Sequence, residues 1–190
     1  MNRTADHKEI YDYLGRKYGR LDILINNAEV LDEGLELPPG GAGFNSISRV
    51  SQEKLRNTFE TNFFQPIALT QSLLPFIRKS PAGRIVNLSS VLGSLTEHSN
   101  PSSRIYDRKR FAYDASKTAI NAFTVHLAQE LRGTPIKVNS AHPGWVKTAM
   151  GGEQAPLELS EGGKTSAQLA TLPDDGPTGG FFHLGQLVPW

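Results

Sequence analysis

Residues 21–26 read LDILIN, a short run that is apolar on both faces and bounded by polar residues. This pattern is typical of a strand inside a parallel sheet, because helices cover both faces of such a sheet. Three more strands are expected, at GRIVNLSS (83–90), PIKVNSAHPG (135–144) and GGFFHLG (179–185).

Helical patterns lie between these strands, over about 5–18, 51–77, 113–131 and 160–172. Ser51 is a plausible N-cap of the second helix, and Pro66 and Pro75 are expected to kink or divide it. Loops are expected at 29–48, which is rich in Gly and Pro, and at 91–110, which is polar. Alternating strands and helices predict an α/β fold with three layers, a doubly wound parallel sheet, in a single domain over residues 1–190.

Composition excludes several classes of function. The chain has 20 basic and 19 acidic residues and a formal charge of +1, so no global field favours a nucleic acid or an anionic membrane as partner. It has no cysteine, which excludes disulfides and thiolate metal sites and fits a cytoplasmic location. We find no signal peptide, no membrane span and no metal-binding motif, and therefore expect no metal ion.

The helix that begins at YDASKTAINAF (113–123) carries a lysine on its apolar stripe. Lys117 lies one turn after Tyr113, so both side chains project from nearly the same side. An ammonium beside a phenol lowers the pKa of the phenol, which favours Tyr113 as a general acid and base. On spacing alone the alternative is equally compatible, namely that Lys117 extends past the stripe to water and Tyr113 is a core residue.

Five segments in order resemble the short-chain dehydrogenase/reductase family, whose sheet is Rossmann-like. They are LINNAE (24–29), ETNFF (60–64), GRIVNLSSVLG (83–93), YDASK (113–117) and VNSAHPGWVKT (138–148). The resemblance implies an oxidoreductase that interconverts a carbonyl and an alcohol on a small-molecule substrate, with NADP or NAD as cofactor.

The resemblance also implies a role for each matching residue. Tyr113 would exchange a proton with the substrate oxygen, and Ser90 would hold that oxygen. Lys117 would lower the pKa of Tyr113 and bind the nicotinamide ribose, and Asn62 would anchor a proton-relay water. The other cofactor-binding residues implied are Asn26 and Ala28 near the adenosine ribose, Pro143 and Gly144 beside the nicotinamide, Val146 at its carboxamide, and Thr148 at the amide or pyrophosphate.

The sequence departs from the family pattern in three places. It lacks the family's initial strand and Gly-x-x-x-Gly-x-Gly turn, so we expect a partial, truncated domain that holds strands 4 to 7 of the family order. Glu29 replaces the usual glycine and adds a carboxylate where a pyrophosphate-bearing ligand approaches. A longer interval between Ser90 and Tyr113 resembles the carbonyl-reductase-like members, which favours NADP.

Two consequences follow from these departures. With strands 1 to 3 absent, LDILIN becomes an edge strand, and an apolar edge invites pairing with another chain, so we expect either a homo-oligomer or poor solubility. The alternative function is a catalytically inactive homologue that acts as an interaction or structural module.

A basic cluster is formed by Arg104, Arg108, Lys109 and Arg110. It either steers an anionic ligand or simply faces water, and it is too short to favour nucleic acid as a partner.

Overall fold

The computed structural model describes residues 3–33, 47–48 and 50–190, and the side chains from residue 6 onward. Within these residues, five strands form one sheet in the order β1-β2-β3-β4-β5. They are β1 (Ile23–Asn26), β2 (Arg84–Leu88), β3 (Lys137–Ala141), β4 (Phe181–His183) and β5 (Gln186–Leu187). β1 to β4 are parallel and β5 is antiparallel to β4. The predicted α/β fold and all four predicted strands are confirmed, and β5 is an addition.

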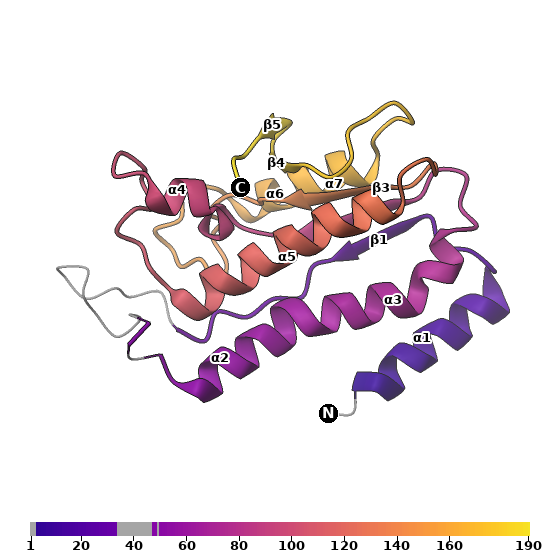
Figure 1. Ribbon diagram of the computed structural model, residues 1–190, viewed down its shortest axis with the longest axis horizontal. Coiled ribbons are helices and arrows are strands. Elements are labelled where there is room, and N and C mark those ends of the chain that lie inside the picture. The colour runs from indigo at the N-terminus through magenta and orange to yellow at the C-terminus, as the bar shows by residue number, and fades with distance from the viewer. Residues whose placement is uncertain (1–2, 34–46, 49) are drawn as a thin grey trace.

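Helices cover both faces of the sheet, as three layers require (Figure 1). One face carries α3 (Gln65–Ile77) and α5 (Phe111–Glu130), with α1 (Arg3–Lys17) packed beside α3, and the other carries α6 (Leu159–Gly162) and α7 (Lys164–Ala170). A separate apolar cluster fills each side. The first is made by Leu24, Leu73, Phe76, Ile77, Ile85, Leu127, Ala128, Leu131, Ile136 and Val138, and the second by Val86, Leu88, Ala141, Leu169, Ala170 and Phe182.

β1 lies at the edge of the sheet in the part of the chain that the structure describes. Its side chains alternate, with Leu24 and Asn26 buried, and with Ile23 and Ile25 43% and 39% exposed. The run LDILIN thus has the composition of a covered strand but leaves two isoleucines partly in water, as expected for an edge.

The long second helix is divided by a π-helical turn. Ser51 caps α2 (Gln52–Phe59), because its Oγ accepts a hydrogen bond from the Lys54 amide at 3.1 Å, as predicted. The turn η1 (Glu60–Phe64) follows and ends just before Pro66, which has no N–H to give to a regular α-helical ladder. Pro75 lies inside α3 without ending it.

The predicted polar loop at 91–110 contains two short elements, η2 (Val91–Gly93) and α4 (Leu95–Ser99). The Ser94 hydroxyl caps α4 by accepting from the Glu97 amide at 3.1 Å. The Ser-x-x-Glu spacing at 94–97 is the sequence signal for this helix start. The other predicted loop, with its PPGGAGF stretch, falls mostly on residues 34–46, outside the described residues.

A chain of buried polar side chains crosses the sheet beneath its carboxyl end. Asn26 Nδ2 donates to Asn87 Oδ1 at 2.8 Å and to Thr70 Oγ1 at 2.9 Å. Asn87 Nδ2 donates to Thr124 Oγ1 at 2.8 Å, and the Ser140 hydroxyl donates to that same oxygen at 2.8 Å. These contacts link β1, β2 and β3 to one another and to the helices α3 and α5.

Candidate functional site

A cleft of about 2350 Å³ opens at the carboxyl ends of the strands, against the first turn of α5. This is where parallel α/β sheets place their ligands. Seven of the residues predicted from the sequence line the cleft: Ala28, Ser90, Tyr113, Pro143, Gly144, Val146 and Thr148. Asn26, Asn62 and Lys117 lie beneath its surface.

Tyr113 and Lys117 share one side of α5, as their spacing predicts. The Lys117 ammonium lies 5.4 Å from the centroid of the Tyr113 ring and donates to the Leu88 carbonyl at 2.9 Å. Lys117 is only 1% exposed, so it does not extend to water. The alternative of a lysine that reaches solvent past the stripe is therefore wrong.

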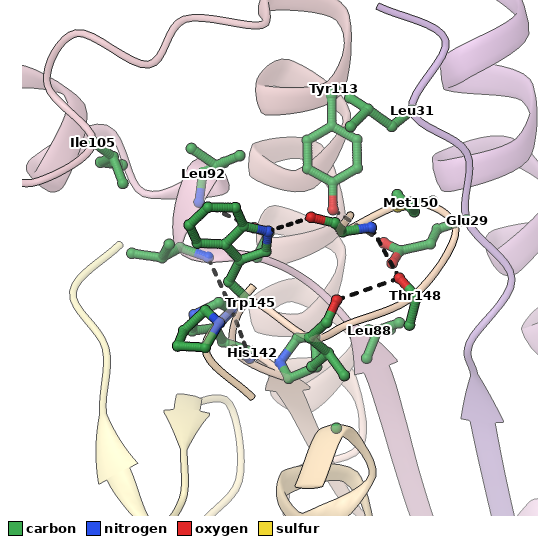
Figure 2. A pocket seen from close by; sticks show the side chains of 18 of the residues that line it. Glu29, Leu31, Leu88, Leu92, Ile105, Tyr113, His142, Trp145, Thr148 and Met150 are labelled. Carbon is green, nitrogen blue, oxygen red and sulfur yellow. Dashed lines mark hydrogen bonds between the residues drawn. The ribbon is translucent and has the colours of Figure 1, made fainter. Parts of the chain in front are cut away.

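Glu29 contacts both members of this pair. Figure 2 shows its side chain beside the Tyr113 hydroxyl. The Tyr113 hydroxyl donates to Glu29 Oε2 at 3.1 Å, and the Lys117 ammonium lies 2.5 Å from the same oxygen. A single carboxylate oxygen therefore accepts from the phenol and the ammonium together. The sequence marked Glu29 as a departure from the family pattern but did not predict these two contacts.

The contact with Glu29 changes the electrostatics of the phenol. The pKa of Tyr113 is raised well above its ordinary value, first by burial and then by the charge and hydrogen bond of Glu29. A hydrogen bond with Ser90 acts in the opposite direction. Burial lowers the pKa of Lys117, while Glu29 opposes that effect. The prediction that Lys117 acidifies Tyr113 is wrong for this arrangement, because burial first and the Glu29 carboxylate second raise the pKa of the phenol.

The two serines at the end of β2 have different surroundings. Ser90 lines the cleft, and its hydroxyl caps η2 by accepting from the Leu92 amide at 3.2 Å. Ser89 is fully buried, and its hydroxyl faces the Lys117 carbonyl at 3.5 Å. Only Ser90 is therefore placed to meet a ligand in the cleft.

Asn62, in the π-helical turn, clamps the segment that carries Glu29. Its Oδ1 accepts from the Val30 amide at 2.8 Å, and its Nδ2 donates to the Val30 carbonyl at 3.0 Å. The same Nδ2 lies 3.1 Å from the Ser116 hydroxyl. The predicted water-anchoring role of Asn62 stays a prediction, because its side-chain groups are used to hold this segment and α5.

Asn26 is not brought to the cleft wall. Its side chain points into the interior toward Thr70 and Asn87, because alternate residues of a strand face opposite sides of the sheet. The next residue, Asn27, lines the cleft in its place.

A turn after β3 forms the opposite wall of the cleft. Gly144 has a φ of +88°, a conformation that favours glycine, and the Thr148 hydroxyl accepts from the Gly151 amide at 2.9 Å. His142 joins this turn to the serine turn, since its Nδ1 lies 3.3 Å from the Val91 amide and 3.4 Å from the Gly144 amide. Burial, with a smaller effect of His183, lowers the pKa of His142 to about 3.

Residues 1–158 match the family model described as short chain dehydrogenase. The chain belongs to this family. Mouse carbonyl reductase [NADPH] 1 is 30% identical over 220 residues, which cover 96% of this chain and 75% of the mouse protein. The structure of the carbonyl reductase Sniffer of Drosophila melanogaster is 31% identical, covers 100% of this chain and 75% of that one, and superimposes with a TM-score of 0.80.

A third relative matches over nearly its whole length. The protein named C-signal of Myxococcus xanthus is 30% identical over 173 residues, which cover 90% of this chain and 94% of that protein. The family match and the carbonyl reductase relatives support oxidoreduction with a nicotinamide cofactor at the level of the family, with NADP favoured.

Glu33, which holds the first turn of α5 beside the cleft, was not predicted. Glu33 is buried and caps α5 from a distance, because its two carboxylate oxygens accept from the amides of Ala112 at 3.2 Å and Tyr113 at 2.9 Å. Burial raises the pKa of Glu33. A carboxylate 80 residues from the helix that it caps leaves no local signal in the sequence.

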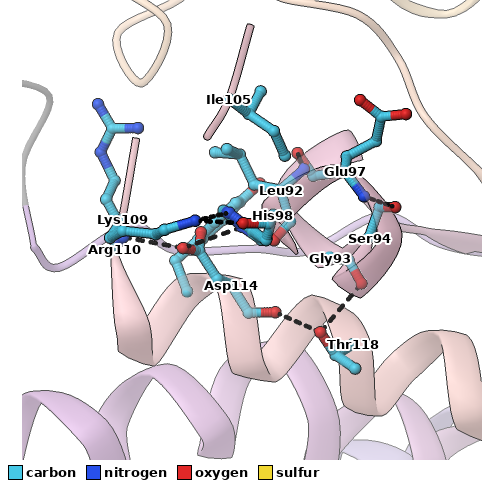
Figure 3. Close-up of polar contacts among 12 residues, drawn as sticks. Leu92, Gly93, Ser94, Glu97, His98, Ile105, Lys109, Arg110, Asp114 and Thr118 are labelled. Carbon is cyan, nitrogen blue, oxygen red and sulfur yellow. Dashed lines mark hydrogen bonds and ion pairs between the residues drawn. The ribbon is translucent and has the colours of Figure 1, made fainter. Parts of the chain in front are cut away.

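The basic cluster proves to be divided between two environments. Lys109 donates to the His98 carbonyl at 2.8 Å, and His98 Nε2 lies 3.3 Å from Asp114 Oδ2 (Figure 3). Arg110 is 7% exposed, so the interpretation of a solvated loop is wrong for it. Arg104 and Arg108 line the cleft, and the Arg108 guanidinium lies 5.4 Å from the centroid of the Trp145 ring.

No helix among the described residues is both long and apolar enough to span a lipid bilayer.

Proposed function

We propose that this chain interconverts a carbonyl and an alcohol on a small-molecule substrate, with NADP as the favoured cofactor and Tyr113 as the residue that exchanges the proton. The observation that carries the proposal is the convergence of the Tyr113 and Ser90 hydroxyls at the floor of one cleft, with the Lys117 ammonium buried beneath them. The carbonyl reductase relatives support this chemistry and the preference for NADP.

The donors at the floor of the cleft suit the nicotinamide half of the cofactor. Lys117 is a buried cation that faces Glu29, at the place where ribose hydroxyls would bind, and the Gly144 turn and Thr148 form the facing wall. For the pyrophosphate half, the sequence contains no Gly-x-x-x-Gly-x-Gly turn. When bound, the cofactor supplies or accepts the hydride.

The chain's own residues would handle the proton and the substrate oxygen. Ser90 would donate a hydrogen bond to the carbonyl oxygen, and Tyr113 would give its proton to that oxygen as charge develops there. Lys117 would stabilise the resulting phenolate once the Glu29 carboxylate no longer occupies the space between them. In the oxidative direction the same phenolate would take the proton back.

The test is a fluorescence titration with NADPH up to millimolar concentration, followed by turnover assays with a panel of aldehydes and ketones. We expect saturable binding and turnover that Tyr113→Phe abolishes, whereas Tyr18→Phe, an exposed tyrosine of the same type, keeps it. Unchanged turnover in Tyr113→Phe would contradict the assignment of the proton donor.

Two observations favour a second candidate, a catalytically inactive homologue that acts as an interaction or structural module. Glu29 occupies the space between Tyr113 and Lys117, and the relative that matches over nearly its whole length has a name that refers to a signal. Absence of NADPH binding at millimolar concentration would favour this candidate over the enzyme. Self-association through β1 and a cytoplasmic location remain predictions under either candidate.

A further inference from the structure

The carboxylate of Glu29 is the most unusual feature of the cleft, because it joins the two groups on which the chemistry depends. Its side chain is 19% exposed at the cleft, whereas that of Lys117 is 2% exposed. The Lys117 ammonium contacts the Leu88 carbonyl oxygen at 2.9 Å and the Glu29 carboxylate at 2.5 Å. A hydrogen bond to a charged group of this kind is stronger than one between neutral groups.

The position of this carboxylate is set by the fold. The next residue, Val30, is held through both its amide and its carbonyl by Asn62, which lies in the π-helical turn. The preceding strand β1 ends at Asn26, whose side chain is fixed in the polar chain across the sheet. The backbone of Glu29 is therefore anchored on both sides, and its side chain is aimed at the floor of the cleft.

We propose that Glu29 is an internal competitor for the cofactor site, whose carboxylate holds the Tyr113 hydroxyl and the Lys117 ammonium in an unreactive pair until it swings into the cleft. This inference rests on the proposed function, because it concerns the same site. In this arrangement, a dinucleotide must displace the Glu29 carboxylate before it can reach the Lys117 ammonium, which weakens its binding. Removing the carboxylate frees both groups for ligand and substrate.

Several charged groups lie near Tyr113, and Glu33 among them contacts the backbone amide rather than the phenol. They are Glu29 after β1, Glu33 in the following turn, and Arg110, Asp114 and Lys117 on or beside α5. Among these residues Glu29 is the one whose side chain accepts a hydrogen bond from the Tyr113 hydroxyl. Its neutralisation is therefore expected to shift the titration of Tyr113 toward lower pH.

Two variants and one control separate this role from a general effect on the fold. Glu29→Gln keeps the size and one acceptor oxygen but removes the charge, and Glu29→Gly removes the side chain. Because Glu29→Gly leaves a buried ammonium with one partner fewer and can fail to fold, Glu29→Gln is the variant on which the test depends. Glu153→Gln is the matched control, since Glu153 lines the same cleft and is exposed.

The first measurement is an ultraviolet absorbance titration of the phenols, with Tyr113→Phe used to assign the Tyr113 transition. We expect Glu29→Gln to move this transition to lower pH, because a charge and a charged hydrogen bond that raise the pKa of the phenol are removed, and Glu153→Gln to leave it unchanged. The second measurement is NADPH affinity by fluorescence, which we expect to rise about tenfold to hundredfold in both Glu29 variants, the range of one charged hydrogen bond.

The outcomes are distinguishable. A Tyr113 transition at the same pH in wild type and Glu29→Gln overturns the inference, whether or not NADPH binds. Equal or weaker NADPH affinity in a folded Glu29→Gln, with binding in wild type, also overturns it. A shifted transition with no NADPH binding in any variant supports the Tyr113–Glu29 contact and overturns the proposed function instead.

Discussion

Replacing His142 by Asn is expected to remove an acid sensitivity from the folded state. His142 Nδ1 accepts from the amides of Val91 and Gly144, and so it must stay unprotonated to join the two turns at the cleft. An Asn side chain offers a carbonyl oxygen to the same two amides and does not titrate. The variant should therefore fold as well as wild type at neutral pH.

The magnitude follows from the pKa of His142, which burial lowers from its ordinary 6.5 to about 3. As the pH falls below 6.5, His142 becomes protonated in the unfolded chain but stays neutral in the folded chain. Acidification down to about pH 3 therefore lowers the free energy of unfolding. At 1.36 kcal/mol per pH unit, wild type loses about 2 kcal/mol between neutral pH and about pH 5 through this residue. Glu33 and Asp114, whose pKa values burial raises, act in the opposite direction in both proteins.

The assay is urea denaturation of wild type and His142→Asn across that pH range at constant ionic strength. The difference in unfolding free energy should change by about 2 kcal/mol in favour of the variant from neutral pH to about pH 5. His126→Asn, at an exposed histidine of α5, serves as the control and should show no such change. Parallel pH profiles for wild type and His142→Asn would refute the reasoning.

Three further predictions concern stability and assembly. Arg84→Met should lower the free energy of unfolding measured by urea denaturation by about 3 kcal/mol, because the buried guanidinium donates to three backbone carbonyls. A decrease below about 1 kcal/mol would contradict this prediction. Gly93→Ala should lower the free energy of unfolding by about 1–3 kcal/mol, because the added Cβ would lie 2.7 Å from the Lys117 backbone. Gly163→Ala is the control, since a Cβ there meets no atom within 4 Å. Equal urea midpoints for the two variants would contradict the prediction. Light scattering is expected to show that the wild type self-associates at high concentration, and Ile25→Lys should abolish this association. A monomeric wild type would contradict the prediction.

Local patterns in the sequence were enough to predict the framework. The strand 83–90 and the helix after Tyr113 were predictable because both elements are buried. The spacing of apolar residues in the sequence therefore matches the faces that pack against the core. The cap at Ser51 was predictable because capping is a contact between neighbours in the chain. The π-helical turn was not predicted, since its Asn62 serves a contact with Val30, 32 residues away.

The candidate site was predicted only as a set of residues, without their electrostatics. Tyr113 and Lys117 come together because they are one helical turn apart. Glu29 lies 84 residues from Tyr113, so its contact depends on how β1 and α5 pack, which the sequence does not state locally. The predicted direction of the Tyr113 pKa shift was wrong, because burial of the phenol and, after it, the contact with Glu29 raise this pKa. Asn26 was predicted to line the cofactor site, but its side chain points into the interior. The direction of that side chain depends on which face of β1 is covered, and the sequence does not show this locally.

The polar chain across the sheet has a consequence for how the strands find their partners. A slip of one residue between β1 and β2 would turn Asn26 to the opposite face and leave the Asn87 amide oxygen facing an isoleucine. Each buried group stranded in this way costs about 1–3 kcal/mol. The chain of amide and hydroxyl groups is therefore expected to disfavour a shifted register between β1 and β2 during folding. Asn26, Asn87, Thr124 and Ser140 are expected to tolerate change only together, because a substitution at one position strands its neighbour.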